Sequence, residues 1–175
     1  MKTRRPLLLS LTILAAVATG IFAGTHLSQG QPAPASQPAG KPRIPSQVID
    51  VSKLATRDTG VGNRRDLFDA PTVTLNTLEG HISVLNVGQE SHPPHQHANE
   101  EAIIMMEGQL EVYIQGKVTT AKKGDVLYFS SYDWHNVKNT GTVPAMYYVI
   151  NWKTDATPNT RPAGTPTSAQ ARIPG

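Results

Sequence analysis

Hydrophobic and polar residues alternate in short runs along much of the chain between residues 72 and 153. Such alternation places one set of side chains on each face of an extended chain and therefore predicts β-strands. Two runs, 103–106 and 147–150, are apolar at every position, so both faces of these strands should be covered. The predicted strands span residues 72–79, 81–87, 101–107, 109–115, 118–121, 126–130 and 145–153.

Glycine-containing turns separate these runs. We expect Gly80 to end the first strand, and Gly116 and Lys117 to form a two-residue hairpin turn, because glycine accepts a positive φ. Residues 48–54 fit either a short helix or an edge strand, and residues 72–153 show no sustained helical periodicity. The pattern predicts a small all-β domain, built as a double sheet or a barrel.

The distribution of prolines divides the chain into a folded region and two tails. The 175 residues are enough for one domain with tails, and ten of the 14 prolines lie outside residues 46–152. We therefore predict a Pro/Ala/Gln-rich linker over residues 25–45, a single domain over residues 46–153 and a disordered tail over residues 154–175.

The net charge of +3 does not indicate nucleic-acid binding, because the positive surplus lies in the tails. Residues 46–153 contain nine Lys or Arg and twelve Asp or Glu, so the predicted domain carries a net charge of −3. A surface that binds DNA or RNA is basic where the protein is folded. The absence of cysteine excludes disulfides, thiolate metal sites and cysteine nucleophiles.

The first 24 residues have the layout of a secretory signal peptide. A basic start precedes an apolar stretch over residues 7–18, and residues 16–18 (Ala-Val-Ala) fit a cleavage site. Arg4 and Arg5 are compatible with both general secretory and twin-arginine export, so the route stays open. We expect a periplasmic or secreted protein without stable membrane insertion after cleavage; an uncleaved anchor is the alternative.

The clearest candidate chemistry lies in residues 88–108. His95 and His97 are two residues apart, so their imidazoles leave the same face of an extended chain. Glu101 follows four residues after His97, and this even step puts its carboxylate on the same face. A fourth donor should come from another segment, and His135 is the candidate.

Three neutral imidazoles and a carboxylate, without sulfur, predict one borderline divalent ion such as Fe, Mn, Ni, Zn or Co. Four protein donors on an ion that accepts six leave one or two positions for water, dioxygen or a substrate. Open positions are typical of a working site rather than a closed structural one. His92 is expected at the entrance of this site or in a solvated loop.

This segment resembles the first motif of the cupin superfamily. That motif is Gly, five residues, His-x-His, three or four residues, Glu, six residues and Gly. The chain supplies Gly88, His95, His97, Glu101 and Gly108 in this order. The single departure is one extra residue between Gly88 and His95.

A later segment resembles the second cupin motif, which is Gly, five residues, Pro-x-Gly, two residues, His, three residues and Asn. Gly124, His135 and Asn139 stand at the matching spacings. Ser130 and Tyr132 replace the Pro and Gly of the family, which affects the shape of the loop and leaves the donor spacing intact.

The resemblance covers about residues 72–152 and is to small single-domain, quercetin-dioxygenase-like cupins of type 2. It implies a jelly-roll β-barrel that binds a metal ion through four residues, His95, His97, Glu101 and His135. Such proteins often pair as homodimers through sheet edges, and a small-molecule ligand or substrate is the expected partner. No DNA-binding segment accompanies the motif pair.

Three classes of function remain open. The first is a metal-dependent oxidoreductase similar to the dioxygenase-like cupins, in which Glu101 is both ligand and catalytic base for a small enol or phenol. The second is a redox-neutral isomerase or lyase that uses the ion as a Lewis acid, and the third is a non-catalytic binder of a sugar or small acid. The sequence shows no other base, nucleophile or organic-cofactor motif, which favours the oxidoreductase.

Overall fold

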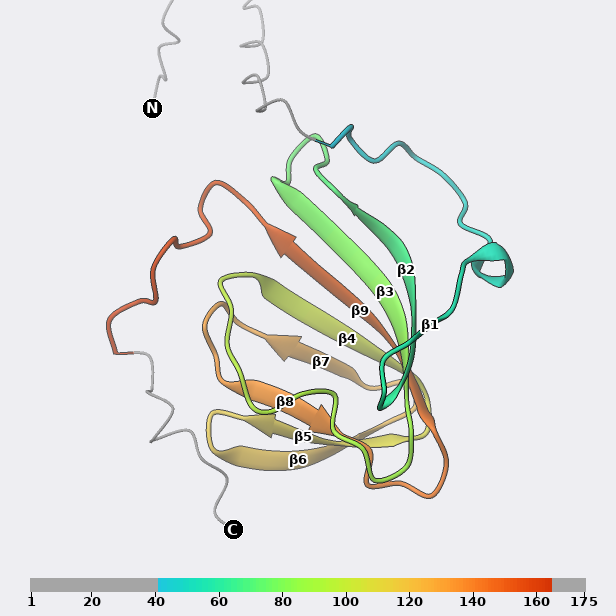
Figure 1. Cartoon of the computed structure of the whole chain (residues 1–175). Helices are drawn as coiled ribbons and strands as arrows, with labels where there is room; N and C mark the ends of the chain where they lie inside the picture. Colours follow the sequence, from blue (N-terminus) through green and yellow to red (C-terminus); the bar gives the residue numbers. More distant parts are fainter. Residues whose placement is uncertain (1–40, 165–175) are drawn as a thin grey trace, which may run out of the picture. The chain divides into compact units, whose positions relative to one another are not determined.

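The computed structural model describes residues 41–164, which form an all-β domain with one short 3-10 helix (Figure 1). The predicted signal peptide over residues 1–24 and most of the predicted linker lie outside the described residues. No helix within the described range has the length and apolar character needed to cross a bilayer.

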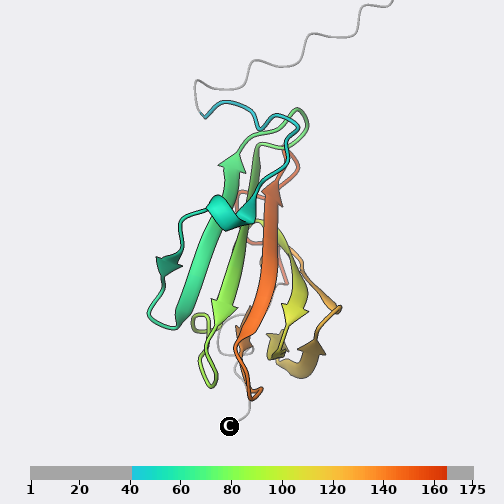
Figure 2. The ribbon, with the colours of Figure 1, turned by 90° about the vertical axis from the view of Figure 1, so that its right-hand side faces the viewer.

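Two antiparallel sheets make up the described domain. One has six strands in the order β1-β2-β3-β9-β4-β7, and the other has three strands in the order β6-β5-β8. Figure 2 shows the long strands β2, β3 and β9 running side by side. The elements are η1 (Val51–Lys53), β1 (Arg57–Asp58), β2 (Gly62–Ala70), β3 (Thr77–Leu85), β4 (Glu100–Glu107), β5 (Gln109–Ile114), β6 (Lys117–Lys122), β7 (Val126–Phe129), β8 (His135–Lys138) and β9 (Ala145–Lys153).

The inner faces of the two sheets share one hydrophobic core. Leu110 and Val112 on β5 are buried in the same cluster as Met105 on β4 and Phe129 on β7. Removal of this apolar surface from water stabilises the packing of the sheets by about 25 cal/mol per Å². The hydrogen-bonded ladders of the two sheets remain separate, so the predicted all-β fold is confirmed as two sheets and not as a closed barrel.

The expected cover on both faces of β4 is incomplete, because only one face of the apolar run is buried. Ile103 and Met105 are buried, whereas Ile104 between them is 37% exposed. On β9, Tyr147 and Val149 are buried, and Tyr148 is partly covered. One face of each strand therefore fills the core, as the period of two requires.

The predicted break at Gly80 is wrong, because β3 continues through this residue to Leu85. The ring of Phe68 on β2 lies against Gly80, and a Cβ at position 80 would come within 2.6 Å of the ring. The strand instead begins only at Thr77. Thr72 Oγ1 accepts hydrogen bonds from the N–H groups of Thr74 and Leu75 and folds the preceding residues into a turn.

The hairpin between β5 and β6 turns one residue earlier than predicted. Its two central residues are Gln115 and Gly116, both with positive φ (49° and 82°), while Lys117 pairs with Ile114 in the ladder. A turn with two positive φ values matches the twist of the flanking strands. Residues 48–54, left open by the sequence, contain the 3-10 helix η1.

The chain on either side of the sheets contacts the domain. The Ile44 N–H donates a hydrogen bond to the carbonyl of Pro71 (3.0 Å), and Asn76 Nδ2 donates to Asp155 Oδ1 (2.8 Å). Tyr132 also reaches the carbonyl of Pro158 (3.4 Å). The domain boundaries at residues 46 and 153 stay predictions.

Candidate metal centre

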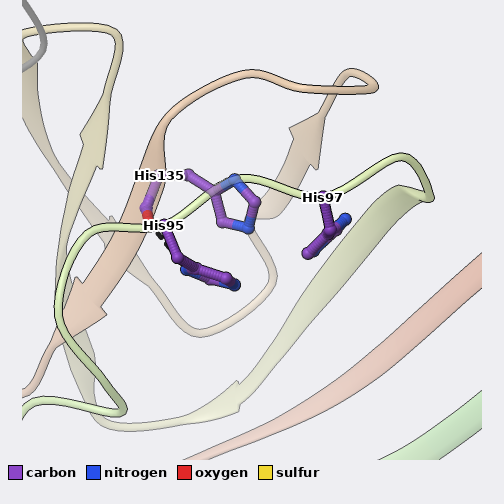
Figure 3. A group of neighbouring side chains, drawn as sticks. All are labelled: His95, His97 and His135. Atoms are coloured by element: carbon purple, nitrogen blue, oxygen red, sulfur yellow. Dashed lines mark hydrogen bonds between the residues drawn. The ribbon is translucent and has the colours of Figure 1, made fainter. Parts of the chain in front are cut away.

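The three predicted histidine ligands come from two segments that the fold places side by side. His95 and His97 lie on the segment that leads from β3 to β4, and His135 begins β8 (Figure 3). His95 and His135 are paired residues of an isolated antiparallel bridge. One nitrogen from each ring lies within 4.8 Å of the other two, a spacing at which three donors can surround one ion.

The other ring nitrogen of each histidine contacts a backbone carbonyl. Nδ1 of His95 lies 3.1 Å from the carbonyl oxygen of His135, and Nδ1 of His97 lies 2.9 Å from that of Asn99. Nδ1 of His135 lies 2.8 Å from the carbonyl oxygen of Asp133. Because a carbonyl can only accept, each Nδ1 carries a hydrogen. In the neutral rings of His95 and His135 the lone pair therefore lies on Nε2, whereas Nε2 of His97 faces the Glu101 carboxylate.

His135 gives the strongest test of whether an ion fits here. Its Nε2 is buried and has no hydrogen-bond partner, while the residue as a whole is 1% exposed. A buried acceptor left unpaired costs about 1–3 kcal/mol, so such atoms usually have a partner. Phe129 stacks on this ring with centroids 4.2 Å apart and holds its orientation. The donor set fits a divalent metal ion.

Glu101 lies next to the three histidines at the start of β4. Its Oε2 is 3.5 Å from Nε2 of His97, and its side chain is 14% exposed. The cluster within 4.8 Å consists of the three histidines, and Glu101 borders it. Its roles as fourth ligand and as catalytic base therefore remain predictions.

Burial and neighbouring charges set the protonation of these groups. Burial lowers the pKa of His95 from 6.5 to about 4, and it also lowers the pKa of His135. Burial acts in the same direction on His97, but the Glu101 carboxylate outweighs it and raises the pKa of His97. Burial would raise the pKa of Glu101, yet the contact with His97 lowers it. At neutral pH the site thus combines an ionised carboxylate with neutral, ligating forms of His95 and His135.

Two further residues singled out from the sequence take supporting places. His92 lines the cavity with its ring centroid 3.9 Å from that of His95, as expected for a residue at the site entrance. Asn139, the last residue of the second motif, is fully buried and makes three hydrogen bonds. Its Nδ2 donates to the carbonyls of Leu85 and Val143 (both 2.9 Å), and its Oδ1 accepts from the Gly141 N–H (2.9 Å).

The histidines open onto a cavity of about 380 Å³ bounded by the inner faces of the strands. The wall on β2, β3 and β9 carries polar side chains that sequence reasoning did not assign to the site, among them Arg64, Glu79, His81 and Asn151. Glu79 and His81 have the same two-residue spacing as His95 and His97. This spacing could have predicted that their side chains lie on the same face of a strand. The sequence pattern gave no indication that Arg64 belongs to the site, because β2 was not predicted as a strand.

The sequence profile of the cupin domain family matches residues 81–151, a span that includes every predicted ligand. The chain contains a cupin domain. The fold of this chain matches that of solved cupin structures over most of the length of those structures. No curated protein matches the chain.

Three structures illustrate the likeness of the cupin fold. An RmlC-like cupin from Shewanella frigidimarina NCIMB 400 has a TM-score of 0.53 at 16% identity, with 64% of this chain and 95% of that chain covered. KdgF from Halomonas sp. has a TM-score of 0.54 at 15% identity, with 63% and 97% covered. A predicted oxalate decarboxylase from Thermotoga maritima has a TM-score of 0.53 at 17% identity, with 61% and 99% covered. At these identities the likeness extends to the fold alone.

Proposed function

We propose that the cupin domain binds one divalent metal ion through the Nε2 atoms of His95, His97 and His135, with Glu101 as the fourth ligand. The observation that carries this proposal is the orientation of the three rings. Each Nδ1 donates to a carbonyl, so in the neutral form of each ring the lone pair that can bind an ion lies on Nε2. Second contacts of this kind fix the tautomer and raise the basicity of ligating histidines.

We further propose that the protein is a metal-dependent oxidoreductase of the dioxygenase-like type, acting on a small organic enol or phenol with dioxygen. When bound to these residues, a divalent ion would supply Lewis acidity toward the oxygen of such a substrate. Glu101 is ionised and lies at the cavity wall, where it can accept the proton of the substrate hydroxyl. The contacts between Nδ1 and the backbone carbonyls fix the orientation of the three histidine rings.

Metal analysis of matched histidine variants tests the binding proposal. We expect the protein loaded with Zn²⁺, Mn²⁺ or Fe²⁺ to hold one ion per chain, as measured by plasma mass spectrometry after gel filtration. His135→Ala should lose the ion, whereas His92→Ala should keep it, because His92 lines the cavity outside the triad. Equal loss in both variants, or full occupancy in His135→Ala, contradicts the proposed ligand set.

Oxygen consumption tests the proposed reaction. The protein loaded with Fe²⁺ or Mn²⁺ should consume dioxygen with catechol or acetylacetone as a probe, and a His135→Ala variant should not. Product formed without oxygen uptake indicates a redox-neutral enzyme instead. A thermal shift on adding the probe, without any turnover, indicates a binding protein.

A redox-neutral isomerase or lyase is the second candidate, and one observation favours it. The cavity wall formed by β2 and β3 includes an ion-paired polar group, Arg64, Glu79 and His81, beside its apolar residues. A polar wall suits a small, oxygen-rich substrate whose protons are moved between atoms.

We also propose that the protein is exported to the periplasm or beyond and forms a homodimer. Support comes from the leader pattern in the sequence and from exposed apolar residues on the edge strand β7, where Val126 is 66% and Tyr128 51% exposed. Cell fractionation with N-terminal sequencing tests export, and light scattering after gel filtration tests the dimer. A retained leader in the cytoplasmic fraction, or a monomer mass, contradicts the respective proposal.

A further inference from the structure

Glu79 and His81 form a hydrogen-bonded pair on the inner face of β3. His81 Nδ1 lies 2.8 Å from Oε1 of Glu79, and the side chains are 11% and 15% exposed. Oε1 also accepts from Nη2 of Arg64 (2.5 Å), and Oε2 accepts from Nδ2 of Asn151 (2.6 Å). Glu79 is therefore held from three sides, and its carboxylate has a fixed position.

This arrangement defines the chemistry of the His81 ring. A carboxylate only accepts, so Nδ1 of His81 carries the hydrogen and Nε2 keeps the lone pair. Nη1 of Arg64 lies 3.4 Å from this Nε2 and can donate only a long, weak hydrogen bond to it, which a substrate would displace. A histidine oriented by a carboxylate, with its second nitrogen available, is the usual arrangement of a general base.

The strand register places this pair on the same sheet face as Glu101, two strands away. Glu79 stands opposite Asn151 of β9, which in turn stands opposite Glu101 of β4. Side chains in such a row point to the same face, and two strand spacings amount to about 10 Å. His81 and Glu101 both line the cavity of about 380 Å³, a volume that can hold a small molecule.

We propose that His81 is a general base of this cavity, positioned by Glu79, and that it acts on a small enolisable carbonyl compound such as an α-hydroxyketone. The proposal rests on the proposed metal site, which would hold the carbonyl oxygen of the substrate. Nε2 of His81 forms a bond to the hydrogen next to the carbonyl as that C–H bond breaks. The released electron pair becomes the enolate, and return of the proton from Nε2 to carbon regenerates a neutral ketone.

His81 could also serve only to stabilise the fold through its hydrogen bond to Glu79. The variant His81→Asn distinguishes this structural role from the proposed role as a base. In His81→Asn the amide Nδ2 takes the place of the ring Nδ1 and can still donate to Glu79, whereas the basic Nε2 is lost. The hydrogen bond that stabilises the fold is thus kept while the proposed base is removed. Thermal midpoint and zinc content should therefore match those of the wild-type protein.

Proton exchange into a simple probe measures the proposed step. We expect the zinc-loaded wild-type protein to exchange the carbon-bound hydrogens of dihydroxyacetone in D₂O, followed by ¹H NMR, and His81→Asn to do so at least about 100-fold more slowly. Equal rates in the two proteins, or no zinc-dependent exchange by the wild type, overturn the role of His81. Failure of the wild type to bind zinc overturns the metal proposal itself.

A second measurement is independent of catalysis. In ¹⁵N NMR spectra of the histidine-labelled protein, His81 should show a protonated Nδ1 and an unprotonated Nε2 when its ring is neutral. Glu79→Gln should shift this balance toward the other tautomer, because the amide can donate to Nδ1 as well as accept from it. An unprotonated Nδ1 in the wild-type protein overturns the positioning role of Glu79.

Discussion

His95 and His135 are 40 residues apart in sequence and are direct backbone partners in the fold. The His95 N–H donates to the His135 carbonyl over 3.1 Å, and the His135 N–H donates back over 2.9 Å. Residues paired in this way have Cα atoms about 5.5 Å apart. The two rings are therefore held close together by the backbone, so little conformational freedom is lost when an ion binds.

Metal affinity should fall as the pH decreases, because one proton competes with the ion for a ligand. Burial keeps the pKa of His95 at about 4 and lowers that of His135, whereas Glu101 raises the pKa of His97 above 6.5. As pH falls, His97 is therefore the first ligand to bind a proton and so to compete with the ion. Zinc affinity, measured by chelator competition, should drop about tenfold per pH unit below that pKa until His95 or His135 also titrates. A constant affinity between pH 5 and 8, or a slope of three protons, contradicts the ligand set.

Phe129→Leu should weaken both the fold and the metal site. The Phe129 ring is fully buried and stacks on His135 at an interplanar angle of 10°, so leucine leaves a void and frees that imidazole. We expect a loss of about 1–3 kcal/mol in the free energy of unfolding and about a tenfold loss in zinc affinity. Denaturant melts and chelator competition measure the two effects.

The control for this variant is Tyr128→Leu on the outer face of the same strand, where the side chain is 51% exposed. It should leave zinc affinity unchanged. If both variants lower zinc affinity equally, the stacking of Phe129 on His135 has no specific role.

Asn139→Asp should destabilise the domain strongly. The Nδ2 group of Asn139 donates to two carbonyls, and a carboxylate oxygen in its place would face both of them in a fully buried position. We expect a loss of about 3 kcal/mol or more in the free energy of unfolding, as measured by urea titration. The same substitution at the exposed Asn159 should change stability little. A stable Asn139→Asp protein would show that these two hydrogen bonds contribute little to the stability of the domain.

Gly108→Ala should cost more stability than Gly88→Ala. Both glycines have positive φ (73° and 75°), so alanine is strained at either position. A Cβ at position 108 would also lie 2.8 Å from the Cα of Ala145, whereas a Cβ at position 88 would meet nothing within 4 Å. Thermal melts should show a loss of about 1 kcal/mol for Gly88→Ala and clearly more for Gly108→Ala. Equal losses would show that packing against β9 is unimportant.

The strands that the sequence predicted best are those with the cleanest alternation. β9 spans residues 145–153 as predicted, and β4 and β5 differ from their predictions by one residue at an end. β2 was missed because its sequence, GNRRDLFDA, is largely polar and shows no apolar face. Pairing with β3 stabilises it, and such pairing between distant segments cannot be recognised from local pattern.

The sequence by itself was enough to recognise the resemblance to cupins and to single out His95, His97 and His135 as candidate ligands, because the offsets within the family motifs can be read along the chain. Tertiary structure decided which ring nitrogen of each histidine stays available, since the carbonyls that accept from Nδ1 include those of His135 and Asp133. It also decided that Glu79 and His81 share a cavity with Glu101. Strands that are neighbours in a sheet need not be neighbours in sequence, and the register between β3, β9 and β4 exists only after the chain has folded.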